Sequence, residues 1–334
     1  MTKHRALITV PQPLRGLILT DDALASLQVA ADVAMNDDDH NWSGEELAAR
    51  LPGVEVIVGS WGMPKLTEEV LAEADSLKLI AYAAGSVKGF VTPAVHQRGI
   101  AVSHAAARIA DSVAEYSLLC ALLGLRRFHE LDRRLKTGES WPKSRDMDTF
   151  EIAGKKVGLL GMGYVGQRSA RLFHAVGAEV WAYDPYLSAE EAERLGVTLA
   201  GLDDLLRACK VISVHLPVTE ETHHLLGARE LGLIQDGAVF VNSARSWVVD
   251  QEAMLGELSS GRFWAALDVF DQEPLPDDHP LRELDNVLLT PHIAGLTRDS
   301  YQNLMATMID EALRLFQGEP LLYQVDPHKL EIMA

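Results

Sequence analysis

The chain has 334 residues, a formal net charge of −18 at pH 7, 48% apolar residues and 23% charged residues. This composition is ordinary for a globular enzyme, and the length accommodates two domains with a core each. The acidity argues against nucleic acid and anionic membranes as partners, because both bind to basic protein surfaces. It does not name a substrate, since an acidic protein can still hold a local basic pocket.

The two cysteines, Cys120 and Cys209, lie in apolar segments, which predicts buried and reduced thiols rather than a disulfide framework. No paired Cys or His spacing suggests a metal site, so we expect no bound metal. The longest apolar stretch, Val113–Leu125, is too short to span a bilayer, and the N-terminus lacks the pattern of a signal peptide. A cytoplasmic location is the resulting expectation.

The first part of the chain alternates between strand-like and helix-like segments, which is typical of a parallel sheet flanked by helices. Apolar spacing predicts helices over Glu45–Leu51 and Thr67–Ala74. The expected strands are short apolar runs: Ala6–Val10, Val29–Ala34, Val54–Ser60, Leu77–Ala83 and Ile100–Ser103.

The pattern changes near Asp111. Ser112 and Glu115 have capping-box spacing and precede a long apolar helix that is expected to end near Arg127. A charged segment, 129–144, follows. Six further strands are predicted, most of them separated by helical segments: Lys156–Leu160, Glu179–Tyr183, Val211–Leu216, Ala238–Asn242, Trp264–Val269 and Val287–Thr290.

A glycine-rich turn, Gly161-Met162-Gly163-Tyr164-Val165-Gly166, follows the first of these six strands. Its first glycine permits a tight turn, the second lets the backbone approach a pyrophosphate, and the third lets the next helix pack on the strand. The N-terminus of that helix then faces the phosphates. Flanked by two apolar runs, the turn predicts a dinucleotide site.

Asp184 follows the next strand and narrows the choice of cofactor. A carboxylate at this place accepts hydrogen bonds from the adenine ribose and repels a 2′-phosphate. Pro185 and Tyr186 come next, so no Arg stands ready to receive that phosphate. The sequence therefore favours NAD over NADP.

Three later predicted strands are followed by residues that suit the reduction of a 2-oxo acid: Arg245, Glu273 and His292. In an open α/β sheet, ligands bind beyond the carboxyl ends of the strands. A guanidinium can bind the carboxylate and polarise the carbonyl oxygen, and a protonated imidazole can donate to the developing alkoxide. A carboxylate beside the imidazole favours its protonated form and fixes its orientation.

With these segments in place, the chain resembles the D-isomer-specific 2-hydroxyacid dehydrogenase family. Matching motifs also include Val113-Ala114-Glu115, Gly154-Lys155-Lys156-Val157-Gly158 and His215-Leu216-Pro217 with Thr222. The resemblance implies a doubly wound Rossmann NAD-binding domain over 108–297. It also implies a discontinuous flavodoxin-like substrate domain over 1–107 and 298–334, because the helix predicted over Thr297–Phe316 crosses back to the N-terminal domain.

The resemblance implies that Arg245, Glu273 and His292 are catalytic, with His292 the proton donor during reduction. Asp184 would hold the adenosine ribose, and Asp268 would accept from the nicotinamide carboxamide. The residues implied in cofactor binding are Gly161, Gly163, Tyr164, Val165, Gly166, Asp184, His215, Pro217, Thr222, Ser243, Ala244, Arg245, Asp268, His292 and Gly295. The family also implies a homodimer through the NAD-binding domain, with segment 129–144 at the interface.

The loop Gly85–Phe90 aligns with the family loop whose backbone amides bind the substrate carboxylate, so Ser86, Val87 and Lys88 are expected to bind substrate along with Arg245 and His292. Lys88 stands where a small residue is common, and it either adds a positive charge to the pocket or points to solvent. 

Two further departures from the family pattern concern the pocket. His104 replaces a usual Asn, and Ser246-Trp247 replaces the common Gly after the catalytic Arg. Trp61 either covers the substrate or fills space between strand and helix.

The expected activity is NAD-dependent reduction of a small 2-oxo acid such as glyoxylate or hydroxypyruvate, or the reverse oxidation of a D-2-hydroxy acid. Segment 59–63 lacks the Arg usual in phosphoglycerate-handling members, which argues against that substrate. Two alternatives stay open: a formate- or phosphite-type dehydrogenase on the same fold, and a non-catalytic NAD-sensing protein similar to a corepressor.

Overall fold

The computed structural model describes residues 3–138, 141 and 148–332. The chain divides into two compact units. The first comprises Met1–Ile109 and Leu296–Ala334, and the second comprises Ala110–Gly295. Helix α5 (Ala106–Leu125) begins in the first unit and continues in the second.

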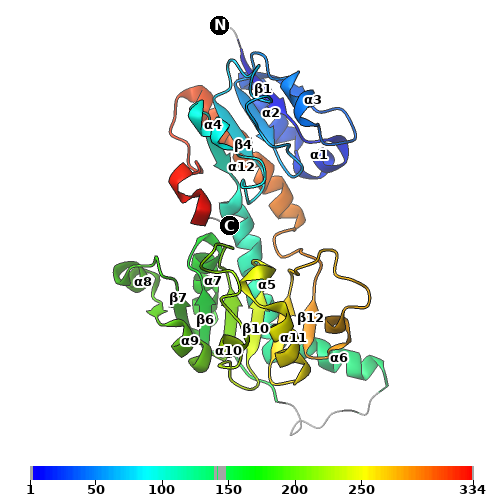
Figure 1. Ribbon diagram of the computed structural model, residues 1–334, viewed down its shortest axis with the longest axis vertical. Coiled ribbons are helices and arrows are strands. Elements are labelled where there is room, and N and C mark those ends of the chain that lie inside the picture. Colours follow the sequence, from blue (N-terminus) through cyan, green and yellow to red (C-terminus); the bar gives the residue numbers. More distant parts are fainter. Residues whose placement is uncertain (1–2, 139–140, 142–147, 333–334) are drawn as a thin grey trace. The chain divides into compact units, whose positions relative to one another are not determined.

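The first unit is built on five parallel strands in the order β2-β1-β3-β4-β5 (Figure 1). This is the flavodoxin-like order that the family resemblance implied. Every residue of β3 and β4 is buried, which explains why these strands appear in the sequence as continuous apolar runs. The bounds are β1 His4–Ile8, β2 Ala31–Met35, β3 Val56–Gly59, β4 Leu79–Tyr82 and β5 Ala101–His104.

The last long helix, α12 (Arg298–Gln317), packs in the core of this first unit. Thr297 caps it by accepting the Ser300 N–H, and Gly318 ends it in the left-handed conformation with φ 72°. The other helices are α1 Gln12–Ile18, α2 Asp21–Ala30, α3 Gly44–Ala48 and α4 Pro93–Gln97. The helix predicted over Thr297–Phe316 corresponds to α12 and lies in the first unit.

Two helix predictions in this part of the chain are wrong. Thr67–Ala74 forms turns, because only one backbone bond there, Leu71 N–H to Thr67, spans four residues. The turns still bury Val70 and Leu71. Ser112 does not begin the long helix, since α5 starts at Ala106.

The second unit contains seven parallel strands in the order β12-β11-β10-β9-β6-β7-β8 (Figure 1). The chain order about β6 is the doubly wound Rossmann order. Strands β6 (Lys156–Leu160) and β7 (Glu179–Tyr183) have the predicted bounds. The remaining strands are β8 Thr198–Leu199, β9 Val211–Val214, β10 Val239–Asn242, β11 Trp264–Leu267 and β12 Val287–Leu289.

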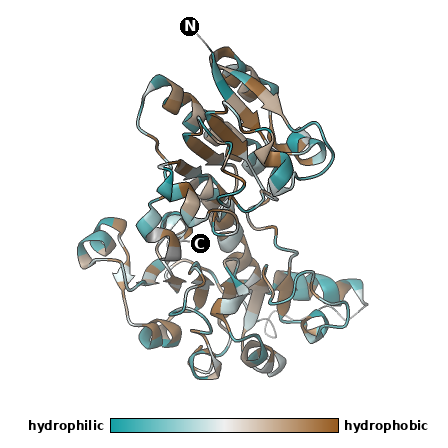
Figure 2. Cartoon of the chain, turned by 45° about the horizontal axis from the view of Figure 1, so that its top comes forward, coloured by the Kyte–Doolittle hydropathy of each residue, from teal (hydrophilic) through white to brown (hydrophobic). Residues whose placement is uncertain are grey.

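Helices cover both faces of this second sheet and bury a core on each. In Figure 2 the strands are mostly brown, whereas the covering helices carry both colours. Both cysteines are buried and free. The helices are α6 Phe128–Lys136, α7 Tyr164–Ala175, α8 Ala189–Leu195, α9 Leu202–Ala208, α10 Ala228–Leu231 and α11 Gln251–Ser259, with short 3₁₀ turns at Ser246–Val248 and Pro280–Glu283. Another 3₁₀ turn, Pro327–Ile332, belongs to the first unit.

Across the ranges 3–138 and 148–332, no helix is both long and apolar enough to cross a membrane. Within each sheet all strands run parallel, so their carboxyl ends lie at one edge. The glycine-rich turn and all three predicted catalytic residues follow the ends of strands in the second sheet. The fold therefore brings them to the edge where α/β proteins bind ligands.

Candidate active site

The glycine-rich turn has the geometry that a dinucleotide needs. Gly161 has φ +97°, and a Cβ there would lie 2.9 Å from the carbonyl oxygen of His215. A Cβ on Gly166 would collide with the Gly161 carbonyl, so helix and strand pack closely at this point. Around Gly163, by contrast, a Cβ would meet open space. This opening at the N-terminus of α7 fits the approach of a pyrophosphate to the backbone.

Asp184 reaches back to this turn. Its Oδ2 accepts the Met162 N–H at 2.7 Å, and its Oδ1 accepts the Tyr186 N–H at 2.9 Å. The carboxylate therefore shapes the glycine-rich turn as well as standing at the end of β7. No local sequence pattern marks this structural role, and the contact of Asp184 with a ribose stays a prediction.

The segment after β9 carries His215, Pro217 and Thr222. The His215 ring nitrogens are buried and have no partner among the residues that the structure describes. Burial lowers the pKa of His215 to about 3, so the imidazole is neutral. Thr222 donates to the Pro217 carbonyl at 2.6 Å and accepts the Thr219 N–H at 2.8 Å. These bonds give the predicted adenosine side of the site a fixed backbone.

The Arg245 loop is held by Asn242, the buried last residue of β10. Its amide donates to the Arg245 carbonyl at 3.0 Å and accepts the Ala244 N–H at 3.1 Å. The Arg245 guanidinium donates to the Ala244 carbonyl at 2.7 Å. Burial lowers the pKa of Arg245, and the charge of Glu273 opposes that shift. The loop backbone is thus held by hydrogen bonds, and it presents the half-buried Arg245 guanidinium next to Ser243.

His292 and Glu273 form a pair, as the sequence predicted for a proton donor. His292 Nδ1 lies 2.8 Å from Glu273 Oε2, while Glu273 Oε1 accepts the Phe270 N–H at 3.0 Å. A carboxylate accepts, so Nδ1 carries the proton and Nε2 is the ring atom left to face a ligand. His292 has φ 54°, a left-handed conformation that few residues adopt without support.

That support comes from Asp268, a fully buried residue after β11. It accepts the Thr290 hydroxyl at 2.5 Å and the N–H groups of Ile293 and Ala294 at 2.8 and 2.9 Å. Asp268 therefore clamps the turn on both sides of His292, just ahead of Gly295. Its predicted contact with the nicotinamide stays a prediction, whereas its hold on the His292 turn is a finding that the sequence analysis missed.

The predicted substrate loop lies in the first unit, after β4. Ser86 is half-buried, the Val87 side chain is buried and Lys88 is exposed. Any contribution of Val87 to ligand binding therefore comes from its backbone. Behind the loop, His104 is only 4% exposed and its Nδ1 lies 2.7 Å from the Gly85 carbonyl oxygen.

The two tryptophans singled out in the sequence have aromatic neighbours. Trp61 lies edge-on to Tyr301 of α12, with ring centroids 5.8 Å apart, and is half-buried. Trp247 is 51% exposed and edge-on to His223 at 5.9 Å. Trp61 is thus anchored by α12, while Trp247 keeps half of its surface for solvent or a ligand.

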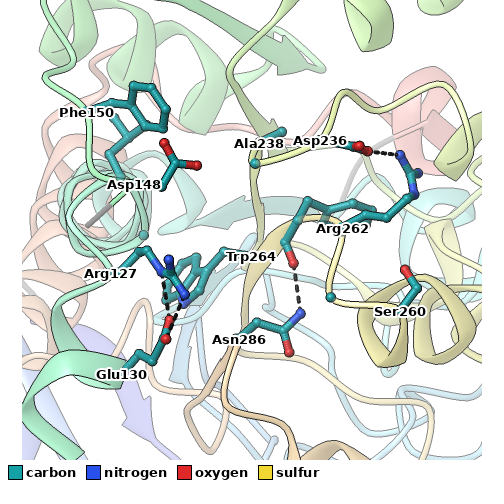
Figure 3. Close-up of a pocket in the computed structure, with 15 residues that line it drawn as sticks. Arg127, Glu130, Asp148, Phe150, Asp236, Ala238, Ser260, Arg262, Trp264 and Asn286 are labelled. Carbon is teal, nitrogen blue, oxygen red and sulfur yellow. Dashed lines mark hydrogen bonds and ion pairs between the residues drawn. The ribbon is translucent and has the colours of Figure 1, made fainter. Parts of the chain in front are cut away.

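A cavity of about 460 Å³ lies in the second unit but at the other edge of its sheet (Figure 3). Its lining includes Asp236, Arg262 and Asn286, which precede β10, β11 and β12. Arg262 pairs with Asp236 at 2.8 Å, and Arg127 pairs with Glu130 at 2.7 Å. This cavity lies at the amino ends of the strands and is separate from the candidate active site.

Comparison with known proteins identifies the family. Residues 118–294 match the model described as D-isomer specific 2-hydroxyacid dehydrogenase, NAD binding domain. The chain belongs to this family. The match falls within the second unit, so that unit is the NAD-binding domain of a D-2-hydroxyacid dehydrogenase family member.

Relatives within the family differ in length and name. The chain is 36% identical over 297 residues to a D-3-phosphoglycerate dehydrogenase of Archaeoglobus fulgidus, which covers 87% of this chain but only 56% of the relative. It is 35% identical to glyoxylate/hydroxypyruvate reductase B of Yersinia pseudotuberculosis, covering 85% of this chain and 88% of the relative. A phosphoglycerate oxidoreductase structure from Rhizobium etli matches with a TM-score of 0.81 and 28% identity, over 97% and 99% of the two chains.

Proposed function

We propose that the protein is an NAD-dependent dehydrogenase that interconverts a small 2-oxo acid and the corresponding D-2-hydroxy acid. The observation that carries the proposal is the His292–Glu273 pair, 2.8 Å apart and supported from behind by Asp268. An imidazole oriented in this way can deliver a proton from Nε2 to one fixed point. Family membership and the glycine-rich turn support NAD as the second substrate.

Arg245 supplies the positive charge that the reaction needs. In the reducing direction the substrate carbonyl oxygen gains negative charge, and a guanidinium nearby stabilises that charge. Arg245 polarises the carbonyl, and His292 Nε2 transfers its proton to the oxygen as C2 is reduced. NADH, when bound, would supply the hydride to C2, and NAD would accept it in the reverse direction. Glu273 keeps its hydrogen bond to Nδ1 throughout and so holds the ring in place.

Glyoxylate or hydroxypyruvate is the substrate class that we propose. A relative named glyoxylate/hydroxypyruvate reductase B is 35% identical to this chain over 289 residues. Segment 59–63 also contains no Arg that could bind a phosphate. Both points favour a small acid that carries one carboxylate.

A substrate panel tests this proposal. Purified protein is mixed with NADH or NADPH and a series of 2-oxo acids, and absorbance at the nicotinamide band is followed. We expect turnover of glyoxylate or hydroxypyruvate with NADH and a loss of at least about 10²-fold in kcat for His292→Gln. Formate and phosphite are assayed with NAD in the same series. Reduction of NAD by either anion, without turnover of any 2-oxo acid, would refute the proposal and support a formate- or phosphite-type dehydrogenase.

We also propose that the NAD-binding domain forms a homodimer through α5 and α6. Leu119, Phe128 and Leu135 are 54, 62 and 45% exposed on these two helices. Exposed large apolar side chains commonly mark a protein interface. Residues 139–140 and 142–144 of the segment expected at the interface lie outside the described residues.

The oligomeric state is tested by sedimentation. We expect a dimer for the unchanged protein and a monomer for Leu119→Glu, because a buried unpaired charge costs several kcal/mol at an interface. Leu322→Glu is the matched control, since Leu322 is also exposed but lies in the first unit. A monomeric wild-type protein would refute the interface.

A further inference from the structure

The candidate carboxylate-binding loop of the first unit presents two backbone donors. Ser86 and Val87 follow β4 at the carboxyl edge of the sheet. Within the parts of the chain that the structure describes, neither backbone N–H donates a hydrogen bond, although the Val87 carbonyl accepts from Phe90 and Val91. Successive unpaired N–H groups in a loop form a concave site for an anion. What they can bind depends on where they point.

Their direction is set at Gly85. The Gly85 carbonyl oxygen lies 2.7 Å from His104 Nδ1. A carbonyl only accepts, so Nδ1 carries the hydrogen and donates it. The Gly85–Ser86 peptide is trans and planar, so its carbonyl and its N–H point in opposite directions. Holding the carbonyl toward His104 therefore turns the Ser86 N–H away from β5.

His104 is itself held firmly at the end of β5. Its backbone N–H donates to the Tyr323 carbonyl at 3.2 Å. The neighbouring Ser103 hydroxyl donates to the buried Glu311 carboxylate at 2.7 Å, and Glu311 also accepts the Tyr323 N–H at 3.1 Å. Burial lowers the pKa of His104, so the imidazole is neutral, and protonation would not remove the Nδ1 hydrogen. The anchor for Gly85 is therefore present across the working pH range.

From this geometry we infer that His104 is a positioning residue for substrate: its bond to Gly85 orients the Ser86 and Val87 amides that bind the substrate carboxylate. The inference rests on the proposed function and adds to it. His104 stands where the family usually has Asn, and Asn has a donor, Nδ2, at the same number of bonds from Cα as His Nδ1. The two side chains can therefore make the same bond to the loop.

Two substitutions separate this role from simple packing. His104→Leu keeps the bulk but loses the donor, and His104→Asn keeps a donor in place. We expect His104→Leu to raise KM for the 2-oxo acid by about tenfold or more, with KM for NADH unchanged, since misplaced charge-assisted hydrogen bonds cost about that factor. His104→Asn should restore KM to within about threefold of wild type. His96→Leu is the matched control, because His96 is a partly buried histidine of the same unit without a bond to this loop.

Binding of oxamate, an unreactive 2-oxo acid analogue, to the NADH complex provides a second measurement. It distinguishes failure of the inference from failure of the proposed function. If the wild-type protein turns over no 2-oxo acid, the proposed function fails, yet weaker oxamate binding by His104→Leu would still support the role of His104. Equal affinity for oxamate in wild type and His104→Leu, with NADH binding intact in both, would overturn it. So would an equal loss in His104→Leu and His104→Asn.

Discussion

His292 adopts a backbone conformation that costs about 1 kcal/mol for a residue other than glycine. Hydrogen bonds to Asp268 offset that cost. The Thr290 hydroxyl donates its only hydrogen to Asp268. Thr290 must therefore accept from the Tyr116 hydroxyl, which lies 2.6 Å away. Burial raises the pKa of Tyr116, which keeps this hydroxyl protonated. The chain from Tyr116 to Asp268 thus stabilises the strained turn that presents His292.

Tyr116→Phe tests this chain of donors. Removing one hydroxyl leaves Thr290 with an unfilled acceptor and loosens the Asp268 clamp, which we expect to lower kcat about fivefold, equivalent to about 1 kcal/mol. Thr290→Val should cost more, and the double variant no more than Thr290→Val alone, because both act on one network. Additive losses in kcat would show that Tyr116 does not act through Thr290.

At the scale of secondary structure, the sequence predicts elements best where periodicity and burial agree. β6 and β7 have the predicted bounds because apolar runs end sharply at polar or glycine residues. β8 was missed because its two residues are both exposed. Ser112 lies inside α5, where capping-box spacing occurs without a helix start.

In the candidate site, too, some residues can be predicted from local sequence and others cannot. Arg245, Glu273 and His292 could be proposed as catalytic because each follows a strand end, a feature visible in sequence. The residues that support them could not, because their contacts join distant segments. Tyr116 and Thr290 are 174 positions apart, and no local pattern marks such a pair. The binding of His104 to Gly85 depends in the same way on the pairing of β4 with β5.

Glu311 connects α12 to the segment that returns along β5. This buried carboxylate accepts the Ser103 hydroxyl and the N–H groups of Leu322 and Tyr323 at 2.7–3.1 Å. Glu311→Gln replaces one acceptor oxygen by a donor, and we expect it to lower the free energy of unfolding by about 1–3 kcal/mol. Asp310→Asn, the same change at the exposed neighbouring position, should cost less than about 0.5 kcal/mol.

Denaturant unfolding of the two variants measures the difference. Circular dichroism follows the loss of helix, and the midpoint is compared with that of wild type at equal slope. Equal midpoints for Glu311→Gln and wild type would mean that the returning segment contributes nothing to stability.

For the whole molecule, stability against acid depends on two kinds of group. Several surface carboxylates have lowered pKa values because Arg or backbone N–H partners hold them charged, as at Asp203 and Asp75. A carboxylate of this kind loses its contribution to stability only as pH falls through about 4. His215 affects stability over a different pH range, since burial lowers its pKa from 6.5 to about 3.

The effect of pH on stability at His215 depends on which state of the protein binds the proton. Below pH 6.5 the unfolded chain protonates this imidazole while the folded protein does not, so stability falls as pH decreases, by at most about 1.4 kcal/mol per pH unit. Between pH 6.5 and 5 the loss reaches about 1.6 kcal/mol, before the carboxylates titrate. His104 and His129 have lowered pKa values as well and act in the same direction.

His215→Leu should therefore flatten the dependence of unfolding free energy on pH between 6.5 and 5, when denaturant unfolding is measured at several pH values. It need not change stability at pH 8, where the histidine is neutral in both states. His40→Leu is the control with opposite sign, because Glu46 raises the pKa of the exposed His40 and protonation there favours the folded state. If the unfolding free energy of His215→Leu depends on pH as steeply as that of wild type, His215 takes up its proton in the folded protein. That result would contradict a neutral, buried His215 ring at the predicted adenosine side.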